Sequence, residues 1–113
     1  MSDTLIQSRT TESHVVTTAV QTAAVSVEAA LGFSAQVVVT ASGSLSGASV
    51  KLQGSLDGTN YADLPDSSQN ITADGVFMWN VNAPYYLYVR IAYVISSGTH
   101  TAASTIIVKG FTD

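Results

Sequence analysis

Residues 50–64, VKLQGSLDGTNYADL, combine the two signals from which the fold of this chain can be predicted. In the first half, apolar residues such as Val50 and Leu52 alternate with polar ones, and this period of two is typical of a half-buried strand. The dipeptide Asp57-Gly58 then interrupts the alternation. It predicts a turn, because Asp caps its own backbone and Gly adopts a positive φ without steric cost. The stretch therefore predicts a strand followed by a tight turn.

Working outward from this stretch, alternation and β-branched residues predict further short strands between segments rich in Gly, Pro, Asp and Ser. Residues 25–31 contain several alanines that favour a helix, but their alternation favours a strand. The predicted strands are residues 15–20, 25–31, 33–41, 49–55, 76–81, 85–95 and 102–110, and residues 71–72 could pair briefly. About seven or eight strands, with turns roughly every eight to twelve residues, predict an all-β chain that forms a single antiparallel β-sandwich, jelly-roll-like or discoidin-like in topology.

The segment 76–81, VFMWNV, is apolar almost throughout. A strand of this composition is expected to be buried on both faces or covered by a neighbour, with Trp79 in the core.

Residues 85–95, YYLYVRIAYVI, form the longest predicted strand, and its two faces differ. The odd-numbered residues, beginning with Tyr85, make the better core face. The opposite face carries Tyr86, Tyr88 and Arg90, which we predict to be an interface or ligand contact. Because Tyr is enriched at protein interfaces, a contact between subunits is favoured over a platform for a sugar.

The composition indicates one domain with an unusual surface. The chain has 113 residues, of which 46% are hydrophobic and only 11% charged, whereas about a quarter is usual. A surface with so little charge is weakly protected against self-association. Two interpretations remain open: partners cover much of the surface, or the domain simply favours Ser and Thr.

The same composition excludes several functions. Four basic residues, in a chain of net charge −4, provide no basic patch for nucleic acid. Without cysteine, disulfides and thiolate sites are ruled out. No apolar run is long enough for a transmembrane helix, so we expect no membrane partner.

Residues 1–13 are polar except for Leu5 and Ile6. We predict a flexible N-terminal arm that orders on a partner, or alternatively a short edge strand, followed by the sandwich domain at 14–113. The segment lacks the apolar core of a signal peptide, so we expect synthesis without one.

Two segments carry a resemblance to a known class of proteins. Residues 50–64 read as an alternating strand, then Gly-Ser, a variable residue, Asp-Gly and an aromatic, and residues 84–93 add an aromatic followed by Val-Arg-Ile. Both resemble segments of small β-sandwich domains in bacteriophage virion proteins, and also of discoidin-like and carbohydrate-binding sandwiches. Tyr61 stands where that pattern often has Trp. The matching positions are Gly54, Ser55, Asp57, Gly58, Asn60, Tyr61, Leu64, Tyr88, Val89, Arg90 and Ile91.

The resemblance implies a non-enzymatic virion structural protein, made in the host cytoplasm and located in the virion. We expect it to decorate or stabilise the capsid as a homo-oligomer in contact with other virion proteins of the capsid or tail. The alternatives are a carbohydrate- or receptor-binding module of a fibre or tail, which would bind a host glycan, and an adaptor in the neck or tail.

Few residues suggest metal or catalytic chemistry. Asp57, with Asp63 and Asp66 nearby, could offer oxygens to Ca²⁺, but the spacing does not match an EF-hand and a turn explains Asp57-Gly58 better. His14 and His100 are too few for a zinc site without carboxylates, and their polar neighbours predict a surface or interface position. No nucleophile elbow or paired-carboxylate arrangement is present, so we expect no enzyme activity, no metal and no cofactor.

Overall fold

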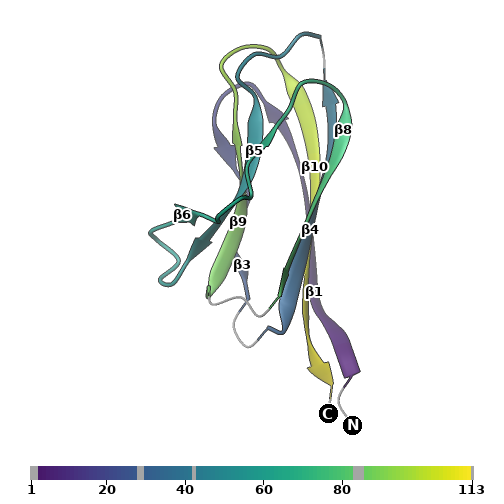
Figure 1. The fold of residues 1–113 in the computed structure, drawn as a ribbon, viewed down its shortest axis with the longest axis vertical. Helices are drawn as coiled ribbons and strands as arrows, with labels where there is room; N and C mark the ends of the chain where they lie inside the picture. Colours follow the sequence, from purple (N-terminus) through teal and green to yellow (C-terminus); the bar gives the residue numbers. More distant parts are fainter. Residues whose placement is uncertain (1–2, 28–29, 42, 83–85, 113) are drawn as a thin grey trace.

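The computed structural model describes residues 3–27, 30–41, 43–82 and 86–112, and within these ranges every strand pairing is antiparallel and no helix forms. No described segment is a helix able to cross a bilayer. Two sheets pack face to face (Figure 1). The strands are β1 (Asp3–Val16), β2 (Val20–Gln21), β3 (Val25–Ser26), β4 (Gly32–Ala41), β5 (Ser49–Ser55), β6 (Ala62–Asp63), β7 (Gln69–Asn70), β8 (Gly75–Asn82), β9 (Tyr88–Val94) and β10 (His100–Thr112).

The order of the strands is that of a jelly roll. Sheet A has the order β1-β10-β4-β8, and sheet B has the order β2-β9-β5-β6, with β3 also on β9 and β7 also on β5. If β2 and β3 count as one interrupted strand, and β6 and β7 as another, eight strands remain. The first then pairs with the eighth, the second with the seventh, the third with the sixth and the fourth with the fifth. This is one long hairpin rolled into two sheets, so the predicted antiparallel β-sandwich is confirmed. Of the two topologies left open, jelly-roll-like and discoidin-like, the strand order is that of a jelly roll.

The strand predicted from residues 50–55 lies near the centre of sheet B. β5 pairs with β9 along its whole length, and with β6 and β7 on its other side. Val50 and Leu52 are fully buried, as their alternation predicted. They join a core between the sheets whose largest fully buried side chains include Tyr93, Phe33 and Ile91.

Residues 3–13 form an edge strand, which is the second of the two alternatives for this segment, rather than a flexible arm. They belong to β1, which pairs with β10 from Asp3↔Thr112 to Val16↔His100. β10 is longer than predicted, and β1 supplies hydrogen-bond partners for its outer edge. Together the two strands extend beyond the end of the sandwich (Figure 1). The polar composition hid the strand because polar residues, Glu12 and His14, occupy core-side positions at the margin of the sheet.

The prediction that residues 76–81 are buried on both faces or covered by a neighbour is wrong for the outer face of the strand, whereas the predicted position of Trp79 in the core is confirmed. Trp79 points into the core, but Val76 and Met78 on the other face are 60% and 62% exposed. In the part of the chain that the structure describes, β8 is the last strand of sheet A and its outer face is uncovered. An apolar run alone cannot distinguish a doubly buried strand from an edge strand with a bare apolar face.

The segments predicted at 15–20 and 25–31 are shorter and more broken in the structure. The chain leaves sheet A at Val16 and joins sheet B at Val20, so a bend separates the two. Among the described residues of the second segment, Val25–Ser26 alone form a strand, β3, and residues 28–29 lie outside the described residues. The brief pairing expected at 71–72 occurs at Gln69–Asn70, and Tyr85 lies outside the described residues.

Candidate functional site

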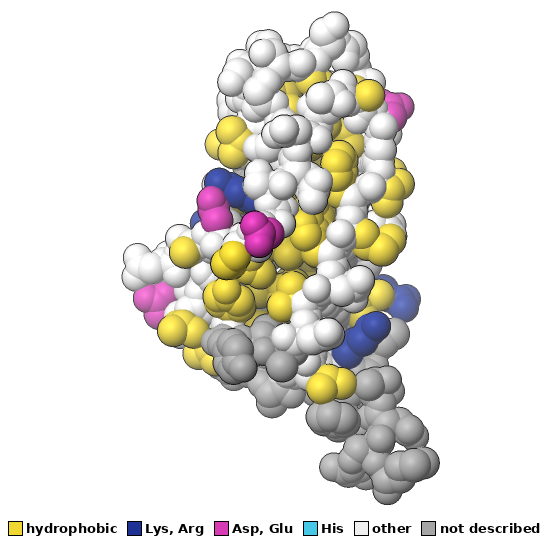
Figure 2. Space-filling view, in the orientation of Figure 1, with side chains coloured by type: hydrophobic (Ala, Val, Ile, Leu, Met, Phe, Trp, Pro, Cys, Tyr) yellow, Lys and Arg dark blue, Asp and Glu magenta, His cyan; other side chains and the backbone are white. Residues whose placement is uncertain are grey.

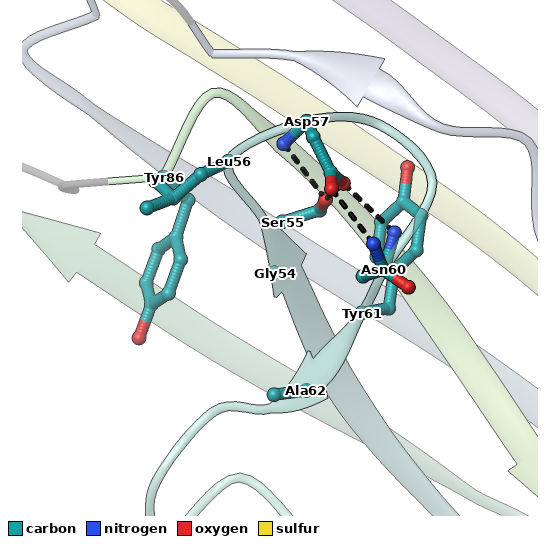
Figure 3. A pocket seen from close by; sticks show the side chains of 8 residues that line it. All are labelled: Gly54, Ser55, Leu56, Asp57, Asn60, Tyr61, Ala62 and Tyr86. Atoms are coloured by element: carbon teal, nitrogen blue, oxygen red, sulfur yellow. Dashed lines mark hydrogen bonds between the residues drawn. The ribbon is translucent and has the colours of Figure 1, made fainter.

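A surface pocket of about 370 Å³ lies at the end of β5, beside the turn that follows it (Figure 3). Tyr86 and Tyr61 flank the pocket on opposite sides of β5. Most of its exposed wall is apolar, and Leu56 beside it is 67% exposed. The lining residues are Gly54, Ser55, Leu56, Asp57, Asn60, Tyr61, Ala62 and Tyr86.

The Asp57 carboxylate organises the turn. Its Oδ1 accepts hydrogen bonds from the backbone N–H groups of Thr59 and Asn60, both at 2.8 Å, and from the Ser55 hydroxyl at 2.9 Å. Its Oδ2 accepts one from Asn60 Nδ2 at 2.8 Å. The backbone N–H groups of Asn60 and Thr59 are the main reason that the pKa of Asp57 lies well below its usual value. Gly58 has a φ of 76°, which favours glycine.

This arrangement serves a turn better than a calcium site. The donors around Asp57 occupy the directions that a cation would use. Asp63 is turned toward Lys51 Nζ and Gln53 Nε2, both at 3.0 Å, and these two hydrogen bonds lower its pKa. Among the described residues, no three His, Asp or Glu side chains gather as metal ligands.

Two of the three predicted contact residues hold this turn on the outer face of sheet B. The Arg90 guanidinium carbon lies 3.8 Å from the centroid of the Tyr61 ring, and Arg90 Nε donates to Gln53 Oε1 at 2.9 Å. The Tyr88 ring lies beneath Gly58, where a Cβ atom would be 3.3 Å from its Cε2. The turn therefore packs against Tyr88 and Arg90, and this covers part of the surface predicted to face a partner.

Tyr86 lies on the other side of the sheet. Its ring packs against Gly54, so closely that a Cβ atom on Gly54 would be 2.5 Å from Tyr86 Cδ1. Gly54 pairs with the fully buried Val89, so both positions face the space between the sheets. The predicted trio of Tyr86, Tyr88 and Arg90 thus does not form one surface. The predicted strand, residues 85–95, assigns Tyr86 a face by alternation, but β9 begins only at Tyr88, so alternation does not apply to Tyr86.

The structure reveals a second polar group, inside the sandwich, that sequence reasoning missed. His100 is fully buried, neither of its ring nitrogens has a hydrogen-bond partner, and burial lowers its pKa. The prediction that His100 lies at the surface or at an interface is wrong, because the residue takes a core-facing position in β10. The Tyr93 ring lies between the two histidines, 6.2 Å from His100 and 6.3 Å from His14 between centroids, and burial raises the pKa of Tyr93 to about 12.

Beside this group, Glu12 joins the two sheets. Its carboxylate accepts hydrogen bonds from the backbone N–H of Ala23, at 3.1 and 3.2 Å, and its Oε2 lies 2.8 Å from His14 Nε2. Ala23 lies between β2 and β3 of sheet B, whereas Glu12 belongs to β1 of sheet A. The contact ties the edge of one sheet to the other, which is a structural role.

Comparison with known proteins gives matches at the level of structure. No protein-family model and no curated protein sequence matches the chain. Similar solved structures include the SPBc2 prophage-derived protein YomS, with a TM-score of 0.56 and 16% identity, and PirA, with a TM-score of 0.55 and 13% identity. The first match covers 92% of this chain and 97% of YomS, and the second covers 85% of this chain and 92% of PirA. At these identities the likeness concerns the fold.

Proposed function

We propose that this chain is a non-enzymatic structural protein of a bacteriophage virion, which decorates or stabilises the capsid and works as an oligomer. The observation that carries the proposal is the fold: one jelly roll that corresponds over nearly its whole length to a prophage-derived protein. The resemblance of residues 50–64 and 84–93 to virion sandwich domains supports the same assignment independently of the fold.

The surface chemistry supports a role in assembly. Only 11% of residues are charged, and the described residues leave the most exposed apolar side chains of β8 uncovered. The charged groups beside the pocket, Asp57 and Arg90, are engaged in holding the turn. Asp57 and Arg90 therefore stabilise the fold. The exposed apolar side chains of β8 remain as the main feature that a partner protein could recognise.

The experiment is quantitative mass spectrometry of purified particles of the phage that encodes the chain, compared with particles from a strain that lacks the gene. We expect the chain in a fixed ratio to the major capsid protein, and particles without it that lose their genome at a lower temperature. A chain that remains in the lysate and is absent from particles would contradict the proposal.

The pocket in Figure 3 favours a second candidate, a carbohydrate- or receptor-binding module. The wall of the pocket combines aromatic rings, Tyr86 and Tyr61, with the polar side chain of Asn60, and proteins bind sugars with such combinations. A glycan array would test this candidate, and binding should disappear in Tyr86→Ala. Met78→Ala is the control, because Met78 is exposed on β8 of the other sheet and does not line the pocket.

A further inference from the structure

The outer face of sheet A gathers most of the exposed apolar side chains in the described part of the chain. The described residues include seven exposed large hydrophobic side chains. Four of the seven lie on the outer face of sheet A: Val15, Val38, Val76 and Met78. The register places three of them together, since Val38 pairs directly with Val76, and Met78 pairs with the next outward residue of β4, Gln36. Val15 lies on β1, at the opposite margin of the sheet.

Among the side chains that the structure describes, charges on this face lie at its two ends. Arg9 and Lys109 are exposed at one end, where Lys109 pairs with the first residue of β4, Gly32. At the other end, Asp74 accepts a hydrogen bond at 2.7 Å from the backbone N–H of Ala41, the last residue of β4. Between these ends the outward positions of the described strands carry uncharged residues only.

Figure 2 shows this arrangement along the right-hand margin, where sheet A lies: yellow side chains stand between an acidic group near the top and basic groups lower down. The length of β4, ten residues, places the two charged ends about 30 Å apart.

We propose that the outer face of sheet A binds the same face of a second copy of this chain, and that each strand of one copy runs antiparallel to the corresponding strand of the other. In this orientation the basic end of each copy lies against the acidic end of the other, and the apolar centres meet. A parallel arrangement would bring Arg9 and Lys109 of one copy against the same residues of the other, and like charges repel. The charge distribution therefore selects both the occupant and its direction.

The size of the face fits a dimer of modest affinity. Four strands about 4.8 Å apart and about 30 Å long give roughly 600 Å² per copy, or about 1,200 Å² in total. This lies at the lower limit of specific interfaces, which begin near 1,200 Å². We therefore expect a dimer that dissociates on dilution.

This proposal names the face through which the oligomer of the proposed function forms, but it does not require that the chain be located in the virion. Oligomeric state is measured on the purified chain, whereas location is measured on particles, so the two can fail separately.

The first experiment is sedimentation velocity over a concentration series. The wild-type chain should shift from monomer to dimer, and Met78→Lys should remain monomeric at every concentration. Leu56→Lys is the matched control, because Leu56 is equally exposed but follows β5 of the other sheet; it should dimerise like the wild type. Circular dichroism and thermal unfolding check that both variants are folded. We expect both to fold, because the two substituted side chains are exposed to solvent.

The second experiment tests the direction of the strands. Asp74→Lys and Lys109→Glu should each weaken the dimer about tenfold, and the variant that carries both changes should recover most of the lost affinity. Asp74→Asn controls for the hydrogen bond to Ala41. A chain that stays monomeric at high concentration, a Met78→Lys variant that still dimerises, or a Leu56→Lys variant that fails to do so would overturn the proposal. A double charge reversal without recovery would overturn the antiparallel direction.

Discussion

The Arg90 guanidinium carbon lies 3.8 Å from the centroid of the Tyr61 ring, and this contact fastens the turn after β5 to the outer face of sheet B. Arg90 is at the same time hydrogen bonded to Gln53, so the cation is held in place from two sides. The contact explains why an Asp-Gly turn is followed by an aromatic in this stretch. The aromatic folds back over the strand that pairs with β5, and the turn is held against its own sheet.

Removing either partner of this contact should loosen the turn. Arg90→Ala and Tyr61→Leu should each lower the free energy of unfolding, and a double-mutant cycle should give a coupling of about 0.5–2 kcal/mol. Urea denaturation measures both quantities. Tyr61→Phe keeps the ring and removes a buried hydroxyl without a hydrogen-bond partner, so it should not destabilise the protein. Strictly additive effects of Arg90→Ala and Tyr61→Leu would contradict the stacking contact.

Gly54 has to be a glycine because the Tyr86 ring occupies the place of a side chain. Gly54→Ala would bring its Cβ within 2.5 Å of Tyr86 Cδ1, and such overpacking typically costs about 1–3 kcal/mol. The melting temperature should therefore fall. Gly75→Ala is the matched control, because the nearest atoms to its Cβ would lie at 3.9 Å. If Tyr86→Ala fails to relieve part of the loss in the Gly54→Ala background, the explanation is wrong.

His100 should make stability depend on mildly acidic pH. Burial lowers its pKa in the folded state, below the ordinary histidine value of 6.5, so below about pH 6.5 the unfolded chain binds a proton that the folded chain does not. Stability is thus complete above this pH and declines as the pH falls toward the folded pKa, by up to about 1.4 kcal/mol per pH unit. The groups near His100 are Tyr93, then His14 and Glu12 beyond it.

Denaturation of the wild type and of His100→Gln at a series of pH values checks this prediction. The difference between the two curves removes the titration of the carboxylates, which both proteins share. We expect the variant to lose less stability than the wild type between pH 6.5 and the region where carboxylates titrate. Parallel curves would show that His100 keeps its ordinary pKa.

Glu12 should protect the amide of Ala23 from hydrogen exchange, because its carboxylate accepts that N–H across the sandwich edge. Glu12→Ala should speed exchange at Ala23 and cost about 1.5–3 kcal/mol of stability, the range for hydrogen bonds to charged groups. Glu12→Gln retains a hydrogen-bond acceptor, so its stability and its exchange rate at Ala23 should lie between those of the wild type and Glu12→Ala. Exchange is followed residue by residue by NMR. Unchanged protection at Ala23 in Glu12→Ala would count against the link between the sheets.

Much of the fold was predictable because its central strands alternate cleanly. β4 and β5 lie within one residue of their predicted bounds, since buried positions in a sandwich must recur every second residue. The edge strands were not predictable in the same way. β1 carries Glu12 and His14 toward the core side at its margin, and β8 carries Val76 and Met78 toward the outside, so their patterns differ from those of central strands.

The candidate site was harder to predict, because it depends on contacts between residues far apart in the sequence. The hydrogen bonds within the Asp57 turn are local, and the Asp-Gly dipeptide predicted them. The contacts of Arg90 with Tyr61, and of Tyr86 with Gly54, follow from the register of β5 with β9, which no local pattern specifies. His100 lies in the core because the even-numbered residues of β10 face inward. The sequence did not indicate this position, because β10 begins at His100, before its apolar run.

A cryo-electron microscopy density map of the parent phage particle tests the central claim most directly. The account predicts jelly-roll density on the capsid surface, repeated with the symmetry of the capsid lattice. Density at a fibre tip would instead select the receptor-binding candidate, and density in a ring at the neck or tail would indicate an adaptor. A particle without density for this chain, in capsid or tail, would contradict the assignment to the virion.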